Sequence, residues 1–183
     1  MNASIDVTNI RIETERLILR PWQISDLNDL YEYASVPGVG EMAGWNHHKS
    51  QEETKQILDM FIQQKKTLAL VLKENEKVIG SLGIEEMKPD PEGPDKQGRE
   101  LGYVLSKDYW GRGLMPEAVM AVVDYCFRVL GYDYLTCGHF LRNDRSRRVV
   151  EKCGFQYFGE SGFTTRYDTV EVSKNYVLYN PNK

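Results

Sequence analysis

The chain has 183 residues, of which 41% are hydrophobic and 27% charged, proportions that are typical of a folded protein and exclude a disordered one. The formal net charge of -4 and the pI near 5.5 argue against a general nucleic-acid-binding protein, which would carry an excess of basic residues. No stretch resembles a signal peptide or approaches the ~20 apolar residues of a membrane span, so we expect a cytoplasmic protein without a membrane partner.

The first part of the chain predicts a strand followed by two helices. Residues 11–20 (RIETERLILR) end in an apolar, strand-like run that a proline stops, because proline cannot donate to a strand ladder. Helical spacing begins near residue 25 and ends before Pro37-Gly38. Ser50 and Glu53 match a capping box, in which each side chain pairs a free backbone N–H group at the start of a helix.

Three further strands are predicted in the middle of the chain. Apolar runs at 67–72 and 78–84 enclose five polar residues, which indicates a hairpin. Residues 88–98 contain three prolines and two glycines and are expected to form a surface loop. Residues 100–105 (ELGYVL) form the third strand.

The second half alternates between helices and strands. We predict a turn at 106–113, a helix at 114–130, a strand at 134–140, a helix at 143–152 and two strands after residue 155. The order is strand, two helices, three strands, helix, strand, helix, two strands. It indicates an α/β (α+β) fold with a single mixed, mostly antiparallel sheet and helices on both faces.

The clearest functional signal is the turn Trp110-Gly111-Arg112-Gly113 between a strand and a helix. The first turn of a helix has unpaired N–H groups and a positive dipole end, and glycines let an anion approach them. A tight connection without a ligand is an equally good explanation of this motif alone. The spacing matches neither a P-loop nor a dinucleotide-binding motif.

Three segments carry a family resemblance. The first is 100–105 with the turn YWGRG and the following PEA; the second is 13–21 (ETERLILRP); the third is 143–155, which contains NxxS and EKCGF. In this order they resemble the GCN5-related N-acetyltransferases, and more narrowly the branch with the ribosomal-protein N-acetyltransferases. The chain departs from the family pattern at Trp110, where Gln or Arg is usual, and at Met115, where Gly or Ala is usual.

The resemblance implies one acetyltransferase domain over residues 1–183, with a GNAT-like fold and acetyl-CoA as co-substrate. It implies that the arm of the coenzyme pairs with the backbone of Val104 and Leu105, and that Asn143 and Ser146 lie near the arm and the thioester sulfur. It also implies that the pyrophosphate binds to the backbone of a continuous segment: Trp110, Gly111, Arg112, Gly113, Leu114 and Met115. No metal is expected.

Acetyl transfer from a thioester to an amine requires a neutral amine and a proton for the leaving thiolate. Glu100 is the first candidate for the base because it lies on the strand expected to carry the thioester, and Glu86 is the second. For each residue taken singly, a solvated surface glutamate is the simpler interpretation. Ser146 is a candidate proton donor, although serine is also common in a first helical turn without any catalytic role.

Other polar residues are ambiguous. In the family, the segment with Trp45 borders the acceptor site, so Trp45 is a candidate substrate wall, while His47 and His48 are expected to be exposed. Four arginines form a basic cluster near the expected coenzyme site, where a solvated helix face is the simpler interpretation: Arg142, Arg145, Arg147 and Arg148. The three cysteines are expected in the core: Cys126, Cys137 and Cys153.

We therefore expect direct attack of a primary amine on acetyl-CoA in a ternary complex. The alternatives are a catalytically inactive acetyl-CoA-binding sensor and an RNA-binding partner of ribosomes, and the negative charge argues against the second. The sequence leaves the acceptor open between a protein N-terminal α-amine, another peptide, a polyamine, an aminoglycoside and an amino acid. It also leaves open whether the protein forms a homodimer.

Overall fold

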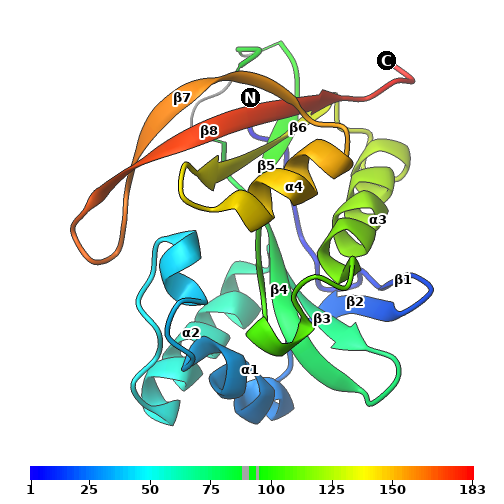
Figure 1. Cartoon of the computed structure of the whole chain (residues 1–183). Helices are drawn as coiled ribbons and strands as arrows, with labels where there is room; N and C mark the ends of the chain where they lie inside the picture. Colours follow the sequence, from blue (N-terminus) through cyan, green and yellow to red (C-terminus); the bar gives the residue numbers. More distant parts are fainter. Residues whose placement is uncertain (88–90, 94) are drawn as a thin grey trace.

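The computed structural model describes residues 1–87, 91–93 and 95–183, and these form one mixed eight-stranded sheet with helices on both faces (Figure 1). This confirms the predicted fold class. The strands are β1 (Ile12–Glu13), β2 (Leu17–Pro21), β3 (Thr67–Leu72), β4 (Lys77–Glu85), β5 (Gly98–Leu105), β6 (Tyr134–Phe140), β7 (Gln156–Thr164) and β8 (Val170–Tyr179).

The sheet has the strand order β1-β2-β3-β4-β5-β6-β8-β7. Neighbouring strands are antiparallel except β5 and β6, which run parallel in the middle of the sheet. These two strands pair only between Gly98–Leu101 and Tyr134–Cys137, although both continue for several residues. Beyond that point they diverge, which opens a cleft in the centre of the sheet.

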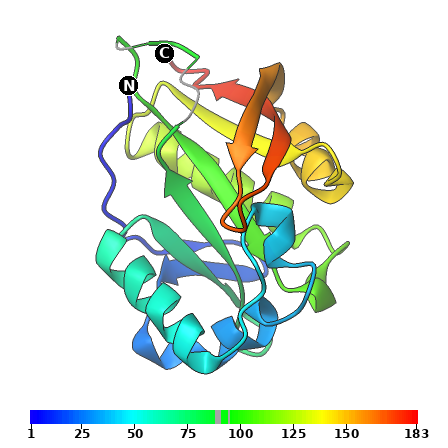
Figure 2. The ribbon, with the colours of Figure 1, turned by 90° about the vertical axis from the view of Figure 1, so that its left-hand side faces the viewer.

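Four α-helices cover the sheet, two on each face (Figures 1 and 2). They are α1 (Leu27–Ala34), α2 (Gln51–Gln64), α3 (Leu114–Arg128) and α4 (Asp144–Lys152), and three 3₁₀ helices join them: η1 (Ile24–Asp26), η2 (Gly40–Ala43) and η3 (Lys107–Tyr109). Helices α1 and α2 pack on one face and α3 and α4 on the other. Among the residues that the structure describes, no helix has the length and the apolar character that crossing a bilayer requires.

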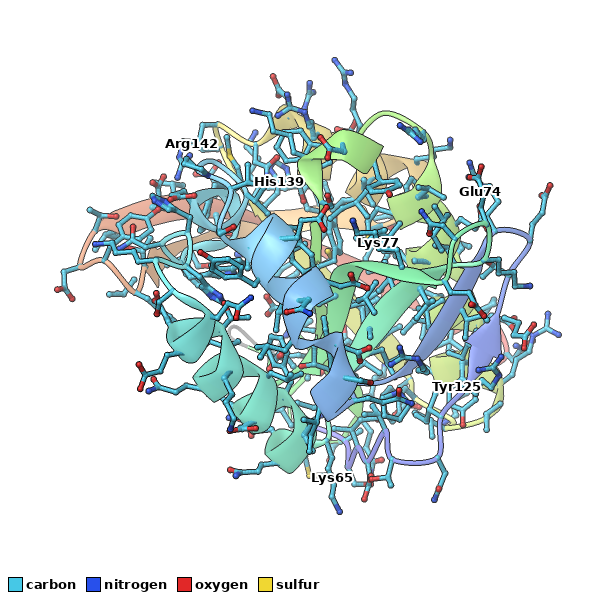
Figure 3. All side chains as sticks on the ribbon, turned by 90° about the horizontal axis from the view of Figure 1, so that it is seen from below. Lys65, Glu74, Lys77, Tyr125, His139 and Arg142 are labelled. Atoms are coloured by element: carbon cyan, nitrogen blue, oxygen red, sulfur yellow. The ribbon has the colours of Figure 1, made fainter. Side chains whose placement is uncertain are left out.

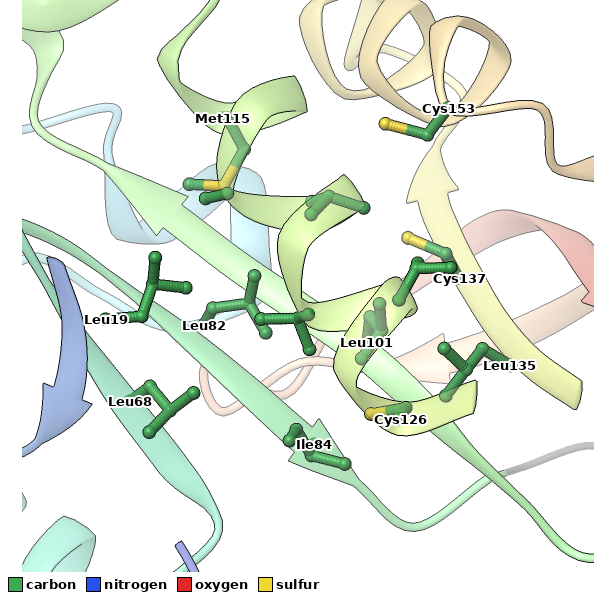
Figure 4. Packing of buried hydrophobic residues seen from close by; sticks show 14 of the residues in the cluster. Leu19, Leu68, Leu82, Ile84, Leu101, Met115, Cys126, Leu135, Cys137 and Cys153 are labelled. Carbon is green, nitrogen blue, oxygen red and sulfur yellow. The ribbon is translucent and has the colours of Figure 1, made fainter. Parts of the chain in front are cut away.

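Helix α3 packs against the centre of the sheet because its apolar residues repeat at helical spacing. Figure 4 shows Met115 and Cys126 of α3 over the sheet residues Leu82 and Leu101. Cys137 and Cys153 lie in the same cluster, so all three thiols are buried as predicted. This packing fixes where α3 begins, and therefore where its first turn meets the cleft.

Three local predictions need correction. The predicted single first strand is a short hairpin, because Thr14 turns the chain by accepting a bond from the Leu17 N–H group. Ser50 caps α2 as predicted. The Glu53 carboxylate, however, accepts from the N–H group of Lys49 at 2.8 Å, whereas the capping box predicts that it accepts from the N–H group of Ser50. The predicted loop at 88–98 includes 88–90 and 94, which lie outside the described residues, and β5 already begins at Gly98.

Candidate functional site

A cavity of about 930 Å³ occupies the cleft between β5 and β6. The structure brings together at this cavity eleven of the candidate site residues, from elements spread over the second half of the chain and the end of β4. They are Glu86, Glu100, Val104, Leu105, Trp110, Gly111, Gly113, Leu114, Met115, Asn143 and Ser146.

The turn before α3 has the backbone that the motif predicts. Gly111 and Gly113 adopt positive φ angles of 76° and 74°, a region that side chains other than glycine rarely occupy. The side chain of Met115 points into the hydrophobic core (Figure 4) and therefore away from the first helical turn. The glycine turn and the first turn of α3 line the cavity, and N–H groups at the start of a helix have no partner within the helix.

A clamp that sequence reasoning missed holds this turn. Glu117 in the first turn of α3 accepts bonds from Thr14 Oγ1 at 2.6 Å and from Arg16 Nε at 2.8 Å. Arg16 Nη1 also donates to the Arg112 carbonyl at 2.8 Å. Burial opposes ionisation of Glu117, but the bonds from Thr14 and Arg16 outweigh it and lower the pKa of its carboxyl group. The resemblance of residues 13–21 to the family's first strand singles out this segment. It does not indicate that Arg16 contacts Glu117, which is 101 positions away.

Trp110 is fixed at the end of β5. Its indole Nε1 donates to the Leu105 carbonyl at 2.8 Å, and the Arg145 guanidinium lies 4.2 Å from the ring centroid. The Val104 carbonyl points the other way, since a Cβ atom on Gly80 of β4 would lie 2.4 Å from its oxygen. Because backbone groups alternate in direction along a strand, the Leu105 backbone faces the cleft and the Val104 backbone faces β4.

Asn143 caps α4, as the sequence predicts: its Oδ1 accepts from the Ser146 N–H group at 3.1 Å. Ser146 is 9% exposed, and its Oγ lies 2.9 Å from the hydroxyl group of Tyr103 on β5. Burial raises the pKa of Tyr103 well above its ordinary value, so this hydroxyl stays protonated at neutral pH. Sequence reasoning missed Tyr103, because the contact joins residues that are 43 positions apart.

The two candidate bases line the cavity but differ in exposure. Glu100 is half-buried on β5, and Glu86 is exposed just after β4. Glu100 points to the α1/α2 face, opposite its neighbour Leu101, which is buried under α3. Glu85, the register partner of Glu100, shares this face and pairs with Lys66 at 2.6 Å.

The predicted basic cluster is divided in the structure. Arg145 and Arg148 line the cavity, together with Lys152. Arg142 instead pairs with Glu171 at 3.1 Å and donates to the Glu41 carbonyl at 3.0 Å. From below, Arg142 lies with His139 on the side where β7 and β8 project, away from Glu74 (Figure 3). Arg147 forms ion pairs within α4, so only part of the cluster faces the cavity.

Two candidate site residues have side chains outside the cavity. Trp45 packs with the α1/α2 core, 5.2 Å from the His48 ring, and the nearby cavity wall is formed by Val39, Met42 and Ala43 instead. The Arg112 side chain bonds to the Asp108 carbonyl at 2.9 Å.

The expectation that both histidines are exposed is wrong for His48. It is 5% exposed, and its Nδ1 lies 2.8 Å from Thr54 Oγ1, because α2 folds back over the irregular segment. His47 is half-buried and contacts Glu41 at 2.7 Å.

No thiol has the properties of a nucleophile. Burial raises the pKa of Cys153 to about 11 and that of Cys126 to about 12, and it raises the pKa of Cys137 as well. All three are therefore protonated at neutral pH, whereas a reactive cysteine needs a thiolate. Over residues 1–87, 91–93 and 95–183, no three His, Cys, Asp or Glu side chains are grouped as metal ligands.

Known proteins are similar to this chain in sequence. A family model described as an acetyltransferase (GNAT) domain matches residues 16–156. The chain is 27% identical to a Bacillus licheniformis protein named uncharacterized N-acetyltransferase p20, over 80% of this chain and 82% of that protein. It is 28% identical to uncharacterized N-acetyltransferase YoaA of Bacillus subtilis (strain 168), over 86% and 92%.

Solved structures share the fold. A GNAT-family acetyltransferase from Bacillus anthracis superposes with a TM-score of 0.81 at 20% identity, covering 93% of this chain and 99% of that one. A ribosomal-protein-S5-alanine acetyltransferase from Vibrio fischeri has a TM-score of 0.74 at 22% identity, covering 95% and 98%.

Proposed function

The chain belongs to the GNAT family of acyl-CoA-dependent N-acetyltransferases, and on that basis we propose that it transfers an acetyl group from acetyl-CoA to a primary amine by direct attack in a ternary complex. One observation carries the proposal: a single cavity contains the α3 turn, the free edge of β5 and the side chains of Glu100 and Ser146. We further propose that the chain is one domain and acts in the cytoplasm.

The residues at the cleft fit acetyl-CoA. The amides of Gly111, Gly113 and the start of α3 would hold the pyrophosphate, and Arg145, Arg148 and Lys152 add positive charge nearby. The coenzyme arm would pair with the Leu105 backbone, in the way that a peptide strand adds to a sheet edge. Val104 would contribute its side chain, because its carbonyl faces β4.

Glu100 acts as the base in this mechanism. When bound, acetyl-CoA supplies a thioester whose carbonyl carbon the amine nitrogen attacks, and the C–S bond breaks. An alkyl amine with a pKa near 10.4 costs about 4.6 kcal/mol to deprotonate at pH 7, whereas an α-amine with a pKa of about 7.7–8.0 costs about 1 kcal/mol. Glu100 accepts the proton that the amine loses. Its half-buried position at the cavity suits this role better than the exposed position of Glu86.

Ser146 supplies the proton that the leaving sulfur requires. Ser146 and Tyr103 both line the cavity, and their hydroxyl oxygens lie 2.9 Å apart. The Tyr103 hydroxyl donates a hydrogen bond to Ser146 Oγ as the serine proton moves to sulfur. After the products leave, Glu100 releases its proton to solvent and the serine recovers one from solvent. We therefore infer that Tyr103 acts as a positioning residue for Ser146.

Titration calorimetry with acetyl-CoA, followed by a thiol-release assay with α-amine peptides and small amines, tests the proposal. We expect acetyl-CoA to bind and at least one amine to release free CoA. Glu100→Gln should bind acetyl-CoA normally and lose about 100-fold in kcat, within the usual range for general base catalysis. Absence of binding would refute the proposal, and binding without turnover for any amine would favour the sensor.

A further inference from the structure

The charged residues that line the cavity are separated by sign. The basic side chains are Arg145, Arg148 and Lys152, all on α4. The acidic ones are Glu85, Glu86 and Glu100, at the end of β4 and the start of β5. Glu85 and Glu100 point to the face opposite α3 and α4. Lys66 pairs with Glu85 at 2.6 Å, so Glu86 and Glu100 are the residues that make the remaining side of the cleft acidic.

Next to the carboxylates, glycines leave the floor of the cavity without side chains. Gly102 of β5 and Gly138 of β6 both line the cavity, and Gly138 follows the last paired residue of β6. Gly138 in turn pairs with Asn175 on β8. A Cβ atom at Gly138 would lie 3.4 Å from Asn175 Oδ1, so this oxygen lies directly over the floor.

A buried polar group at this floor is independent of the acidic residues and points to a hydrogen-bond donor as ligand. Asn175 is 8% exposed and uses its Nδ2 to bond Ser161 Oγ at 3.0 Å, which leaves Oδ1 as an acceptor. An ammonium group, which only donates, matches such an acceptor.

A bridge between two segments narrows the entrance to the cavity on the side of the β7–β8 hairpin. The turn between β7 and β8 meets the segment after η2, where the Arg166 N–H group donates to the Gly44 carbonyl at 2.8 Å (Figure 2). The Tyr167 hydroxyl donates to the Glu41 carbonyl at 3.3 Å, and Phe163 packs against Gly44. This contact favours a compact acceptor over the N-terminus of a folded protein.

We propose that the acceptor is an aliphatic di- or polyamine, a primary amine with a second ammonium group across a methylene chain. The inference rests on the proposed acetyl transfer. The reacting nitrogen lies over Gly102 beside Glu100, the apolar wall of Met42 and Phe140 contacts the methylenes, and Glu86 binds the distant ammonium. The net charge of -4 also attracts a polycation.

Three acceptors with four carbon atoms each and different groups at the far end test the proposal: 1,4-diaminobutane, 1-aminobutane and 4-aminobutanoate. With saturating acetyl-CoA, we expect kcat/KM for the diamine to exceed that for the monoamine about 10-fold, and the carboxylate to be the poorest acceptor. The advantage of the diamine should shrink as salt rises, because the second contact is electrostatic.

Glu86→Gln should reduce the ratio of diamine to monoamine kcat/KM several-fold. Glu74→Gln is the matched control, since Glu74 is exposed in the β3–β4 turn on the far side of the molecule (Figure 3). Equal kcat/KM for diamine and monoamine, or a better α-amine peptide, overturns the inference but leaves acetyl transfer intact. Failure to bind acetyl-CoA overturns both.

Discussion

At the scale of single residues, the pair of hydroxyl groups between β5 and α4 decides how the leaving thiolate receives its proton. Ser146 Oγ and the Tyr103 hydroxyl lie 2.9 Å apart, and burial keeps the tyrosine protonated by raising its pKa. Such a pair can deliver a proton to the cleft without a charged acid.

We expect Ser146→Ala to lower kcat about 100-fold, Tyr103→Phe to lower it less, and the double variant to be no slower than Ser146→Ala, because both groups act in one step. Steady-state kinetics at saturating acetyl-CoA measures this. Because its pKa is raised, Tyr103 should cause no loss of kcat up to about pH 10. Tyr125→Phe, outside the cavity, is the control; additive losses in the double variant would contradict the pairing.

At the scale of elements, the turn before α3 depends on backbone geometry that only glycine adopts without strain. Gly113→Ala should destabilise the protein by about 1–2 kcal/mol and also weaken acetyl-CoA binding. Gly131 has a comparable φ of 68° after the other end of α3, so Gly131→Ala should cost similar stability but leave the affinity unchanged. Denaturation and calorimetry separate the two effects, and equal affinities in both variants would argue against the turn as the pyrophosphate site.

The segment around η2 should depend on pH through Glu41. Burial opposes its ionisation, but bonds from His47 and the Gly38 backbone dominate and lower the pKa of Glu41 to about 2. A lowered pKa stabilises the fold above the ordinary value of 4.5 and loses that effect as pH falls toward 2.

Glu41→Gln should therefore cost about 1 kcal/mol at pH 7, with the difference from wild type shrinking below about pH 4.5. Urea denaturation at a series of pH values measures it, with the exposed Glu52→Gln as control. A difference that stays constant down to pH 3 would contradict the assigned pKa.

At the scale of the whole molecule, the core should protect every thiol until the chain unfolds. The three cysteines are buried and their pKa values are raised. We expect a thiol-specific disulfide reagent to label none of them quickly in the native protein and all three in urea. Rapid labelling of one thiol in native conditions would show that α3 or α4 opens locally.

Regular elements were predictable from the sequence because each has a local signal. Helix α3 shows an apolar stripe and β6 an apolar run, and the predicted bounds of β6 match the structure. The glycine turn before α3 was also visible.

Contacts between distant segments had no local signal. The burial of His48 depends on Thr54 and the α2 fold-back, and the Glu117 clamp depends on a hairpin at the start of the chain. The cleft itself arises because β5 and β6 stop pairing after Leu101. No residue in either strand predicts that the pairing ends there.

That short parallel ladder has a thermodynamic consequence. In the sheet, the strands β1–β5 are joined to the strands β6–β8 by only four register pairs, between β5 and β6. A ligand bound beyond these pairs would add contacts between the two groups of strands that the chain itself lacks. Ligand occupancy and unfolding free energy are then linked, with Tm rising with the logarithm of acetyl-CoA concentration above its Kd. In a cell, resistance to proteolysis would accordingly follow the supply of the acyl donor.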